Sequence, residues 1–391
     1  MIEDYQIYDN LDLYFPQTKQ KEDDNTLFRF LYLCTVVALV GFGLVTLYSA
    51  SYNEAFSNNL KGSYYVLRQT TFALSGFAIF ALIQYIPIKF IRKVIFPFLL
   101  VSLVLMALTI VGPFGVEKLG ARRWLQIGPL PSFQPSELLK VSTILFLAHL
   151  FSKEELTKFT KIFILAMIGI GALLILLQRD YSTTLVFLFV VLAMLLLGGF
   201  EIRYLVLAAI TLALFLTIFL FLEPYRIKRV VSFIFPSIDP TGLNWQVQNS
   251  LKAVMSGNLF GKGLGNGIYK LGIIPEVHSD FIFASLAEEG GFIAIAIFST
   301  LFALFGFSGF RVAKKLRDRK YTFESLSAFG ITLMILWQAI INIMVVSALL
   351  PPTGIPLPFF SQGGTNLFVI ISECGLLYLF MGLVNKESSY E

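Results

Sequence analysis

The chain has 391 residues, of which 56% are hydrophobic and only 14% are charged. This composition excludes an ordinary soluble globular protein and predicts an all-α integral membrane protein that crosses the bilayer many times. The formal net charge of +5 says little before the charges are assigned to the two sides of the membrane. The two cysteines both lie in apolar runs and indicate neither a disulfide framework nor a metal site.

The apolar segments predict about ten transmembrane helices, some of them short. A polar, mobile N-terminal tail over 1–27 precedes the first span at 28–48, which is longer than the apolar part of a cleaved signal peptide. Further spans are expected near 68–86, 94–112, 137–151, 162–178, 183–200, 205–222, 281–307, 324–347 and 366–384. Residues 28–384 thus form one membrane domain, followed by a short tail over 385–391.

Lysine and arginine predict the orientation. A loop expected at 308–322 carries six of them, and the loops at 89–93 and 153–161 fall on the same side. We expect this side, and with an even number of helices both termini, to be cytoplasmic. The outward side then holds 113–136, the turn at 179–182, a large loop over 223–279 between helices 7 and 8, and 348–365.

The outward segments are also rich in positive charge. Long loops cross the membrane regardless of charge, but the remainder suggests an anionic ligand such as a phosphate or diphosphate headgroup. The residues concerned are Lys118, Arg122, Arg123, Arg179, Arg226, Lys228, Arg229, Lys252, Lys262 and Lys270.

The segment 275–291, PEVHSDFIFASLAEEGG, runs from a polar loop into an apolar span. Asp280 lies at the junction beside His278, and Glu288 and Glu289 follow about two helical turns later. Acids at membrane depth are costly and usually face a bundle interior or a wet cavity, so these residues are a candidate site. The alternative is that Asp280 caps a helix while the two glutamates pair with buried cations.

Two earlier outward motifs carry charge at helix starts. In QPSELLK (134–140), Pro135 suits a helix start, Ser136 can cap it, and Glu137 and Lys140 share one face. They form either an ion pair within a capped helix or a buried pair that shapes a polar cavity. Arg123, beside an interfacial tryptophan, could bind phosphate. An Arg179–Asp180 neighbour pair at a helix end reads as a local ion pair or, less favoured, as functional.

Three further outward segments complete the pattern. Residues 245–251 form an amphipathic helix, and the glycines at 257–265 form either a flexible connector or a loop that presents N–H groups to phosphate. The run PPTGIPLPFFSQGG (351–364) is too apolar for a solvated loop and too rich in proline and glycine for a helix. We expect it to re-enter the protein and line the outward cavity, with Asn342 satisfying part of its backbone.

Together these motifs resemble the SEDS family, which includes FtsW, RodA and SpoVE. The resemblance covers residues 30–384. It rests on LYSAS at 47–51, GARRWL at 120–125, QPSELLK at 134–140, DP at 239–240, WQVQNS at 245–250, LFGKGLG at 259–265 and the two long motifs at 275–291 and 351–364. The glycine-rich stretch at 263–270 is more similar to the division type than to the elongation type.

The resemblance implies a peptidoglycan glycosyltransferase of a bacterial cytoplasmic membrane. It would polymerise lipid II at the outer face by inverting transfer from an undecaprenyl-diphosphate-linked glycan, with a class B penicillin-binding protein and other divisome proteins as partners and no nucleic acid. Asp280 would be the catalytic base. Substrate binding is assigned to Arg123, Lys140, Gln246, Ser250, Lys262 and Lys270, and support to Glu137, His278, Glu288, Glu289 and Ser361.

Some positions depart from the family pattern, and other functions stay open. The family's Pro and Gly after the fifth span are absent from 178–183, and the last motif ends in GGTN rather than GGSS. The key acid and the bases are kept, so we expect activity. A divalent cation is compatible with the reaction, but the sequence shows no dedicated ligand set. The alternatives are a lipid II flippase, a divisome scaffold without activity, and an elongation-type polymerase.

Overall fold

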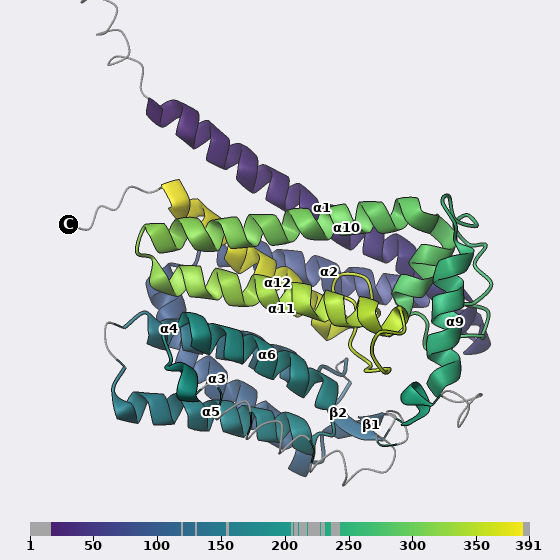
Figure 1. Cartoon of the computed structure of the whole chain (residues 1–391), viewed down its shortest axis with the longest axis horizontal. Coiled ribbons are helices and arrows are strands. Elements are labelled where there is room, and N and C mark those ends of the chain that lie inside the picture. The colour runs from purple at the N-terminus through teal and green to yellow at the C-terminus, as the bar shows by residue number, and fades with distance from the viewer. Residues whose placement is uncertain are drawn as a thin grey trace, which may run out of the picture.

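The computed structural model describes residues 17–385, apart from 119, 130, 154–155, 236–242 and most of 205–230. The described part is a bundle of α-helices with one small β-hairpin at one end (Figure 1). The span expected at 205–222 and the DP dipeptide at 239–240 lie outside the described residues or almost wholly so. The all-α membrane fold is therefore confirmed, while the count of about ten helices stays a prediction.

Seven helices in the described part of the chain are long and apolar enough to cross a membrane. They are α1 (Gln17–Ser57), α2 (Tyr64–Ile83), α3 (Ile88–Val111), α5 (Lys158–Leu177), α10 (Ile282–Asp318), α11 (Thr322–Val346) and α12 (Gly364–Met381). Two shorter helices, α4 (Pro135–Phe151) and α6 (Tyr181–Leu197), have 17 residues each. The side chains of α4 are buried almost throughout, so α4 is a central helix of the bundle.

The most extensive helix–helix contacts join α2 with α12, α10 with α11, and α3 with α4. Small residues allow close approach where the chain needs it. A Cβ at Gly309 of α10 would lie 2.1 Å from the Thr332 hydroxyl of α11, so only hydrogen fits there. Close contact through small residues is the usual means of packing helices in lipid, where apolar burial drives association weakly.

Two boundaries differ from the sequence predictions. Helix α10 continues to Asp318, so the basic segment expected as a loop over 308–322 is mostly helical and the turn is confined to 319–321. Lysine and arginine are good helix formers, and they are favoured near a helix C-terminus, so the helix extends past its apolar part. Helix α1 begins at Gln17, and part of the expected tail is therefore helical too.

Helix α10 is in fact two helices that meet at Gly291. This residue has φ 61° and ψ −158°, and a Cβ on it would lie within 3 Å of the backbone of residues 257–261. The N–H groups that the break leaves unpaired are used by the same loop: Phe292 donates to the Asn258 carbonyl and Ile293 to that of Leu259. The kink thus fixes the outer loop against the helix that follows Asp280.

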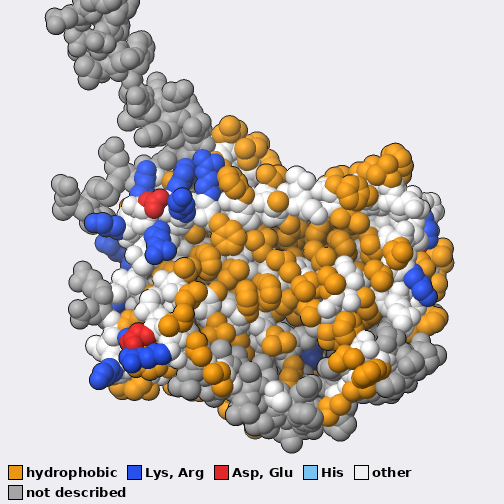
Figure 2. Space-filling view, in the orientation of Figure 1, with side chains coloured by type: hydrophobic (Ala, Val, Ile, Leu, Met, Phe, Trp, Pro, Cys, Tyr) orange, Lys and Arg blue, Asp and Glu red, His pale blue; other side chains and the backbone are white. Residues whose placement is uncertain are grey.

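The two ends of the bundle differ. One end, which we call the basic end, holds the turns at 84–87, 152–153 and 319–321, and Lys and Arg side chains gather there (Figure 2). The opposite end, the cavity end, holds the hairpin of β1 (Gly115–Lys118) and β2 (Ala121–Leu125), helix α9 (Leu243–Ser256) and the segment 347–363 (Figure 1). Hydrophobic side chains cover much of the face between the two ends, as a lipid-facing surface requires (Figure 2).

The segment 347–363 has no regular structure, yet much of it is buried, as the sequence predicted. Phe359 and Phe360 are almost fully buried and pack against aromatic rings of α1 and α10. The side-chain amide of Asn342 donates to the Ile355 carbonyl at 2.8 Å, which confirms its expected role. Irregular backbone inside the bundle is tolerated because protein groups satisfy it.

Candidate active site

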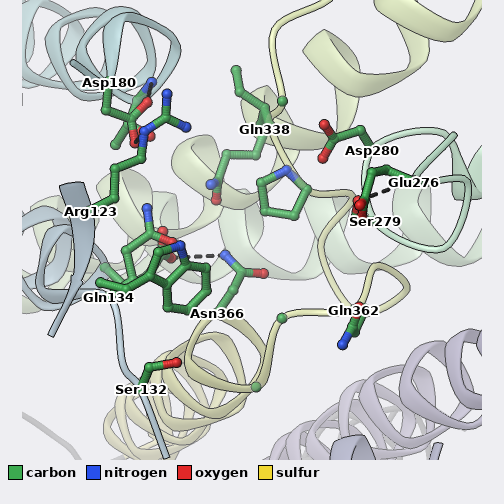
Figure 3. Close-up of a pocket in the computed structure, with 18 of the residues that line it drawn as sticks. Arg123, Ser132, Gln134, Asp180, Glu276, Ser279, Asp280, Gln338, Gln362 and Asn366 are labelled. Atoms are coloured by element: carbon green, nitrogen blue, oxygen red, sulfur yellow. Dashed lines mark hydrogen bonds and ion pairs between the residues drawn. The ribbon is translucent and has the colours of Figure 1, made fainter. Parts of the chain in front are cut away.

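A cavity of about 400 Å³ opens at the cavity end. Its walls come from the first turns of α2, from β2, from the starts of α4, α6 and α12, from Gln338 of α11, from the loop before α10 and from the segment 353–364. Its charged lining residues are Arg68, Arg123, Glu137, Asp180, Glu276 and Asp280. The sequence-predicted residues Arg123 and Glu137 are thus brought to the same cavity as Asp280, which follows more than 140 residues later in the chain. Figure 3 shows Arg123 and Asp280 on opposite sides of it.

Asp280 lies half-buried at the entrance to α10, with its carboxylate at the cavity. The helix N-cap is Phe281, so the alternative that Asp280 is the cap residue is wrong. Its backbone is held on two sides: its N–H donates to the Glu276 carbonyl at 3.2 Å, and its carbonyl accepts from the Asn342 amide at 2.9 Å. Gly354 lies beside this carboxylate, since a Cβ there would be in van der Waals contact with Oδ2 at 3.4 Å, and its φ of 74° favours glycine.

Ser361 and His278 fix the loop that carries Asp280. The Ser361 hydroxyl donates to the Ser279 carbonyl and accepts from the Leu357 N–H at 2.8 Å. The His278 carbonyl accepts from the Gln362 N–H at 2.9 Å. Burial lowers the pKa of the His278 imidazole below its usual 6.5, and nearby Glu276 opposes this shift. Both residues therefore support Asp280 through the backbone of its loop.

Arg123 and Asp180 face each other on the other side of the cavity from Asp280 (Figure 3). The Arg123 Nε lies 3.5 Å from Asp180 Oδ2, and its Nη2 donates to the Arg179 carbonyl at 3.0 Å. Asp180 also caps α6 by accepting from the Thr183 N–H. The ion pair of Asp180 is thus with Arg123 of the hairpin, because Arg179 has a left-handed backbone with φ 60° and its guanidinium reaches Gly120 instead.

Glu137 and Lys140 form a buried pair below the cavity, with Nζ 2.9 Å from Oε1. The other oxygen of Glu137 accepts from the Asn366 amide at 2.8 Å (Figure 3). Glu137 lines the cavity but Lys140 does not, so the ammonium group predicted to bind a diphosphate is used inside the protein. The expected cap is also wrong: Gln134 is the N-cap, and the buried Ser136 hydroxyl has no partner within the described residues.

Lys262, Lys270, Glu288 and Glu289 form a second charged group, which we call the lysine–glutamate cluster. Lys262 lies 2.7 Å from Glu288, and Lys270 lies 2.5 Å from Glu289. The Ser49 hydroxyl of α1 donates to Glu289 at 2.6 Å. None of the four residues lines the cavity. The expectation that both lysines bind substrate is therefore not supported, because each is already paired with a carboxylate.

The glycine-rich loop completes this cluster. The N–H of Gly265 donates to Glu289, and the N–H groups of Ile268 and Tyr269 donate to Glu288. The loop therefore does present backbone donors to an anion, but the anions are carboxylates of the chain itself. Its function is to bind the outer loop to α10 just beyond Asp280.

Gln246 and Ser250 lie on α9 and do not line the cavity. The Ser250 hydroxyl is buried and donates to the Val346 carbonyl at 3.0 Å, which joins α9 to the end of α11. Gln246 is half-buried on the same helix. The structure gives Ser250 a packing role and places neither residue in the cavity lining, so their substrate contacts stay a prediction.

One wall of the cavity was not expected from the sequence. Tyr65, Arg68, Gln69 and Phe72 line it from α2. Gln69 donates to the Ser361 carbonyl and accepts from the Gly363 N–H, so it holds the irregular segment in place. The signal was present, because these residues recur at helical spacing at the polar start of an apolar helix. In the described part of the chain no group of three or more His, Cys, Asp or Glu side chains is placed to hold a metal ion.

Comparisons with known proteins agree with this architecture. Residues 29–382 match the family model FTSW_RODA_SPOVE, described as cell cycle protein. The chain is 35% identical over 353 residues to a probable peptidoglycan glycosyltransferase FtsW of Borreliella burgdorferi, covering 89% of this chain and 95% of that protein. It is 33% identical over 354 residues to a protein of the same name from Geobacter sp. strain M18, covering 90% and 95%.

Solved structures show the same fold. A chain of a peptidoglycan synthase complex that coordinates polymerization and crosslinking superposes with a TM-score of 0.75 at 27% identity, covering 92% of this chain and 98% of that one. The rod shape determining protein RodA of Thermus thermophilus superposes with a TM-score of 0.66 at 25% identity, covering 91% and 97%.

Proposed function

This chain belongs to the FtsW/RodA/SpoVE family, also called SEDS, and we propose that the cavity beside Asp280 is its active site. The chain is a peptidoglycan glycosyltransferase of a bacterial inner membrane, in keeping with relatives that bear this name over almost their whole length. We further propose that it polymerises lipid II into β-1,4 glycan strands for the division septum. The FtsW names of its relatives favour that role over elongation.

One observation carries the proposal: a carboxylate and a paired arginine face each other across one polar cavity (Figure 3). Glycosyl transfer from a lipid diphosphate needs a base for the acceptor hydroxyl and positive charge for the leaving group. Asp280 and Arg123 are the residue types for these two tasks, and they lie on opposite sides of the space where the sugar would sit.

In the proposed reaction, the acceptor 4-hydroxyl oxygen forms a bond to the anomeric carbon of the donor sugar. The bond from that carbon to the diphosphate oxygen breaks, and its electron pair leaves with the diphosphate. The hydroxyl proton passes to the Asp280 carboxylate, and the Arg123 guanidinium stabilises the charge that develops on the leaving group. Attack opposite the departing diphosphate inverts the anomeric centre.

We propose that the cavity end faces outward and that both termini are cytoplasmic. The gathering of Lys and Arg at the basic end supports this orientation, because such residues favour the cytoplasmic side (Figure 2). We also propose a class B penicillin-binding protein as partner. The fold shared with a chain of a synthase complex that both polymerises and crosslinks supports this choice.

The test is gel-resolved polymerisation of labelled lipid II by the purified protein, with and without a co-expressed class B penicillin-binding protein. Wild type should make polymer, and Asp280→Asn should make no detectable polymer in the same reaction time. The matched control is Asp318→Asn, the same chemical change at the exposed basic end, which should polymerise like wild type.

Other outcomes lead to other functions. Movement of labelled lipid across vesicles without polymer would establish a flippase. Loss of polymer from every variant together with retained partner binding would establish a scaffold. Equal polymer from wild type and Asp280→Asn would keep the enzyme but reject Asp280 as its base.

A further inference from the structure

The wall of the cavity formed by α2 contains an unassigned cation. Tyr65, Arg68, Gln69 and Phe72 share one face of the helix, and all four line the cavity. Three of them have neighbours: the Tyr65 ring packs at a tilt against the His278 ring, Gln69 binds the backbone of 361–363, and Phe72 packs on Gly364. Arg68 is exposed, and its guanidinium has no hydrogen-bond or ion-pair partner among the residues that the structure describes.

The other cations expected to bind a diphosphate do not compete for this role. Lys140, Lys262 and Lys270 do not line the cavity, and each is paired with a glutamate. Arg123 does line the cavity, but Asp180 balances much of its charge. Arg68 is therefore the cavity cation whose positive charge is available for a ligand, and a planar guanidinium suits phosphate oxygens because it can donate two parallel hydrogen bonds.

Arg68 lies on the Asp280 side of the cavity. The His278 ring, two residues from Asp280, is 5.1 Å from the Tyr65 ring one turn before Arg68. Gln69 donates to the Ser361 carbonyl, and Ser361 in turn donates to the Ser279 carbonyl. The start of α2 and the Asp280 loop are thus joined through two routes, whereas Arg123 lies across the cavity (Figure 3).

If the proposed function holds, the opposite positions of Arg68 and Arg123 correspond to separate sites for the acceptor and the donor. In an inverting displacement the attacking hydroxyl and the leaving diphosphate lie on opposite faces of the anomeric carbon. The donor diphosphate therefore faces Arg123, opposite Asp280. The acceptor brings its hydroxyl to Asp280 and carries its own diphosphate two sugars away, which needs a second cationic site on the Asp280 side.

We propose that Arg68 binds the diphosphate of the acceptor lipid, while Arg123 binds that of the donor. The cavity then has two phosphate sites with different tasks. The site at Arg123 stabilises developing charge, and the site at Arg68 holds the acceptor in register without taking part in bond breaking. Loss of Arg68 should consequently weaken acceptor binding more than it slows the saturated reaction.

The test needs a substrate that acts only as donor. Lipid II with a galactose on its N-acetylglucosamine 4-hydroxyl cannot act as acceptor, because the attacking hydroxyl is blocked. When this donor carries the label, labelled product forms only by transfer of its disaccharide onto unlabelled lipid II. Initial rates of the first transfer are measured while donor and acceptor are varied separately, in nanodiscs of zwitterionic lipid and again with added phosphatidylglycerol. The proteins are wild type, Arg68→Gln, Arg68→Lys, Arg123→Gln and the control Lys61→Gln, which removes one exposed charge just before α2.

We expect Arg68→Gln to raise the apparent KM for the acceptor about tenfold or more, the size of a lost charge-assisted phosphate contact, with saturated rate and donor KM within about twofold. Arg68→Lys should recover part of the loss. Arg123→Gln should instead raise the donor KM and lower the saturated rate, and Lys61→Gln should match wild type.

Three results would overturn the inference: an unchanged acceptor KM, a rise in donor KM alone, or an effect that is present only with phosphatidylglycerol. The last would assign Arg68 to an anionic phospholipid headgroup. Absence of product from wild type would refute the proposed function itself, which is a separate result.

Discussion

The cavity and the lysine–glutamate cluster are built from the same kinds of residue, yet they do opposite things. In the cluster each carboxylate is paired with a lysine and receives backbone N–H groups, and three of the four side chains are nearly inaccessible. In the cavity Asp280 is half-buried and Arg68 is exposed. The difference teaches that a charge near the membrane is informative only when its partners are known, because a satisfied charge stabilises the fold and an accessible one can bind substrate.

The largest effect on polymerisation is expected from Asp280→Asn in the cavity. It removes a base but keeps size and polarity, so polymerisation should fall about 10²–10⁴-fold, the usual range for loss of acid–base catalysis. The melting temperature of the purified protein should stay within a few degrees of wild type. A large fall in thermal stability would instead place Asp280 among the residues that hold the fold.

The opposite behaviour is expected of Glu289→Gln in the cluster. It leaves the Lys270 ammonium buried without its counter-charge, and breaking a buried pair costs about 3–5 kcal/mol. Thermal unfolding in detergent should show a clear loss of stability. The double variant Glu289→Leu with Lys270→Met is the control, because removing both charges should restore part of the loss. A single variant as stable as wild type would contradict the assignment.

A smaller effect is expected for Asp180, which both stabilises the fold and contributes to the proposed active site. This residue both caps α6 and holds Arg123. Asp180→Asn keeps a capping side chain, and the cost in stability should be below about 1 kcal/mol. Polymerisation should fall about tenfold because Arg123 loses the group that orients it. The matched change Asp180→Ala should add a loss of stability to the same loss of activity, and equal activity of Asp180→Asn and wild type would remove Asp180 from the site.

The smallest effect concerns His278 and pH. Burial lowers the pKa of its imidazole in the folded protein, so the unfolded chain takes up a proton first as pH falls. The stability that neutral His278 allows is complete above about pH 6.5 and is lost as pH falls from there through the lowered pKa. Unfolding temperatures of wild type and His278→Gln between pH 5 and 8 should differ in slope below about 6.5 and run parallel above it. Parallel curves throughout would show that His278 does not titrate on unfolding.

Much of the architecture follows from local sequence. Apolar runs of membrane length gave the positions of the long helices, and Pro135 marked the start of α4 as expected. The composition of 351–364 identified a buried irregular segment, and Asn342 was correctly matched to its backbone. The position of Asp280 at a polar cavity was also expected, since an acid at the entrance of an apolar helix stands out against its surroundings.

Other features depended on distant partners. Ser49 contacts Glu289 and Lys270 across more than 200 positions of sequence, and Gln69 contacts residues almost 300 positions away. Nothing local distinguishes Lys270, which is paired, from Arg68, which is accessible. Three paired lysines were therefore expected to bind substrate and Arg68 was not, because a sequence shows the type of a positive residue but not the group that neutralises it.

The sequence by itself determined that the protein has many membrane helices and where most of these helices lie. It also identified Asp280 as the acid expected to take part in the chemistry. The length of an apolar segment and the free-energy cost of a charged residue inside it both depend on residues within a few helical turns, so both can be recognised from the local sequence. Only the tertiary structure decided which charges are used up in pairs, that Arg123 is bound by Asp180, and that α2 supplies a wall of the cavity. Those outcomes depend on distances of a few ångströms between helices far apart in sequence, where electrostatic and hydrogen-bond energies are set.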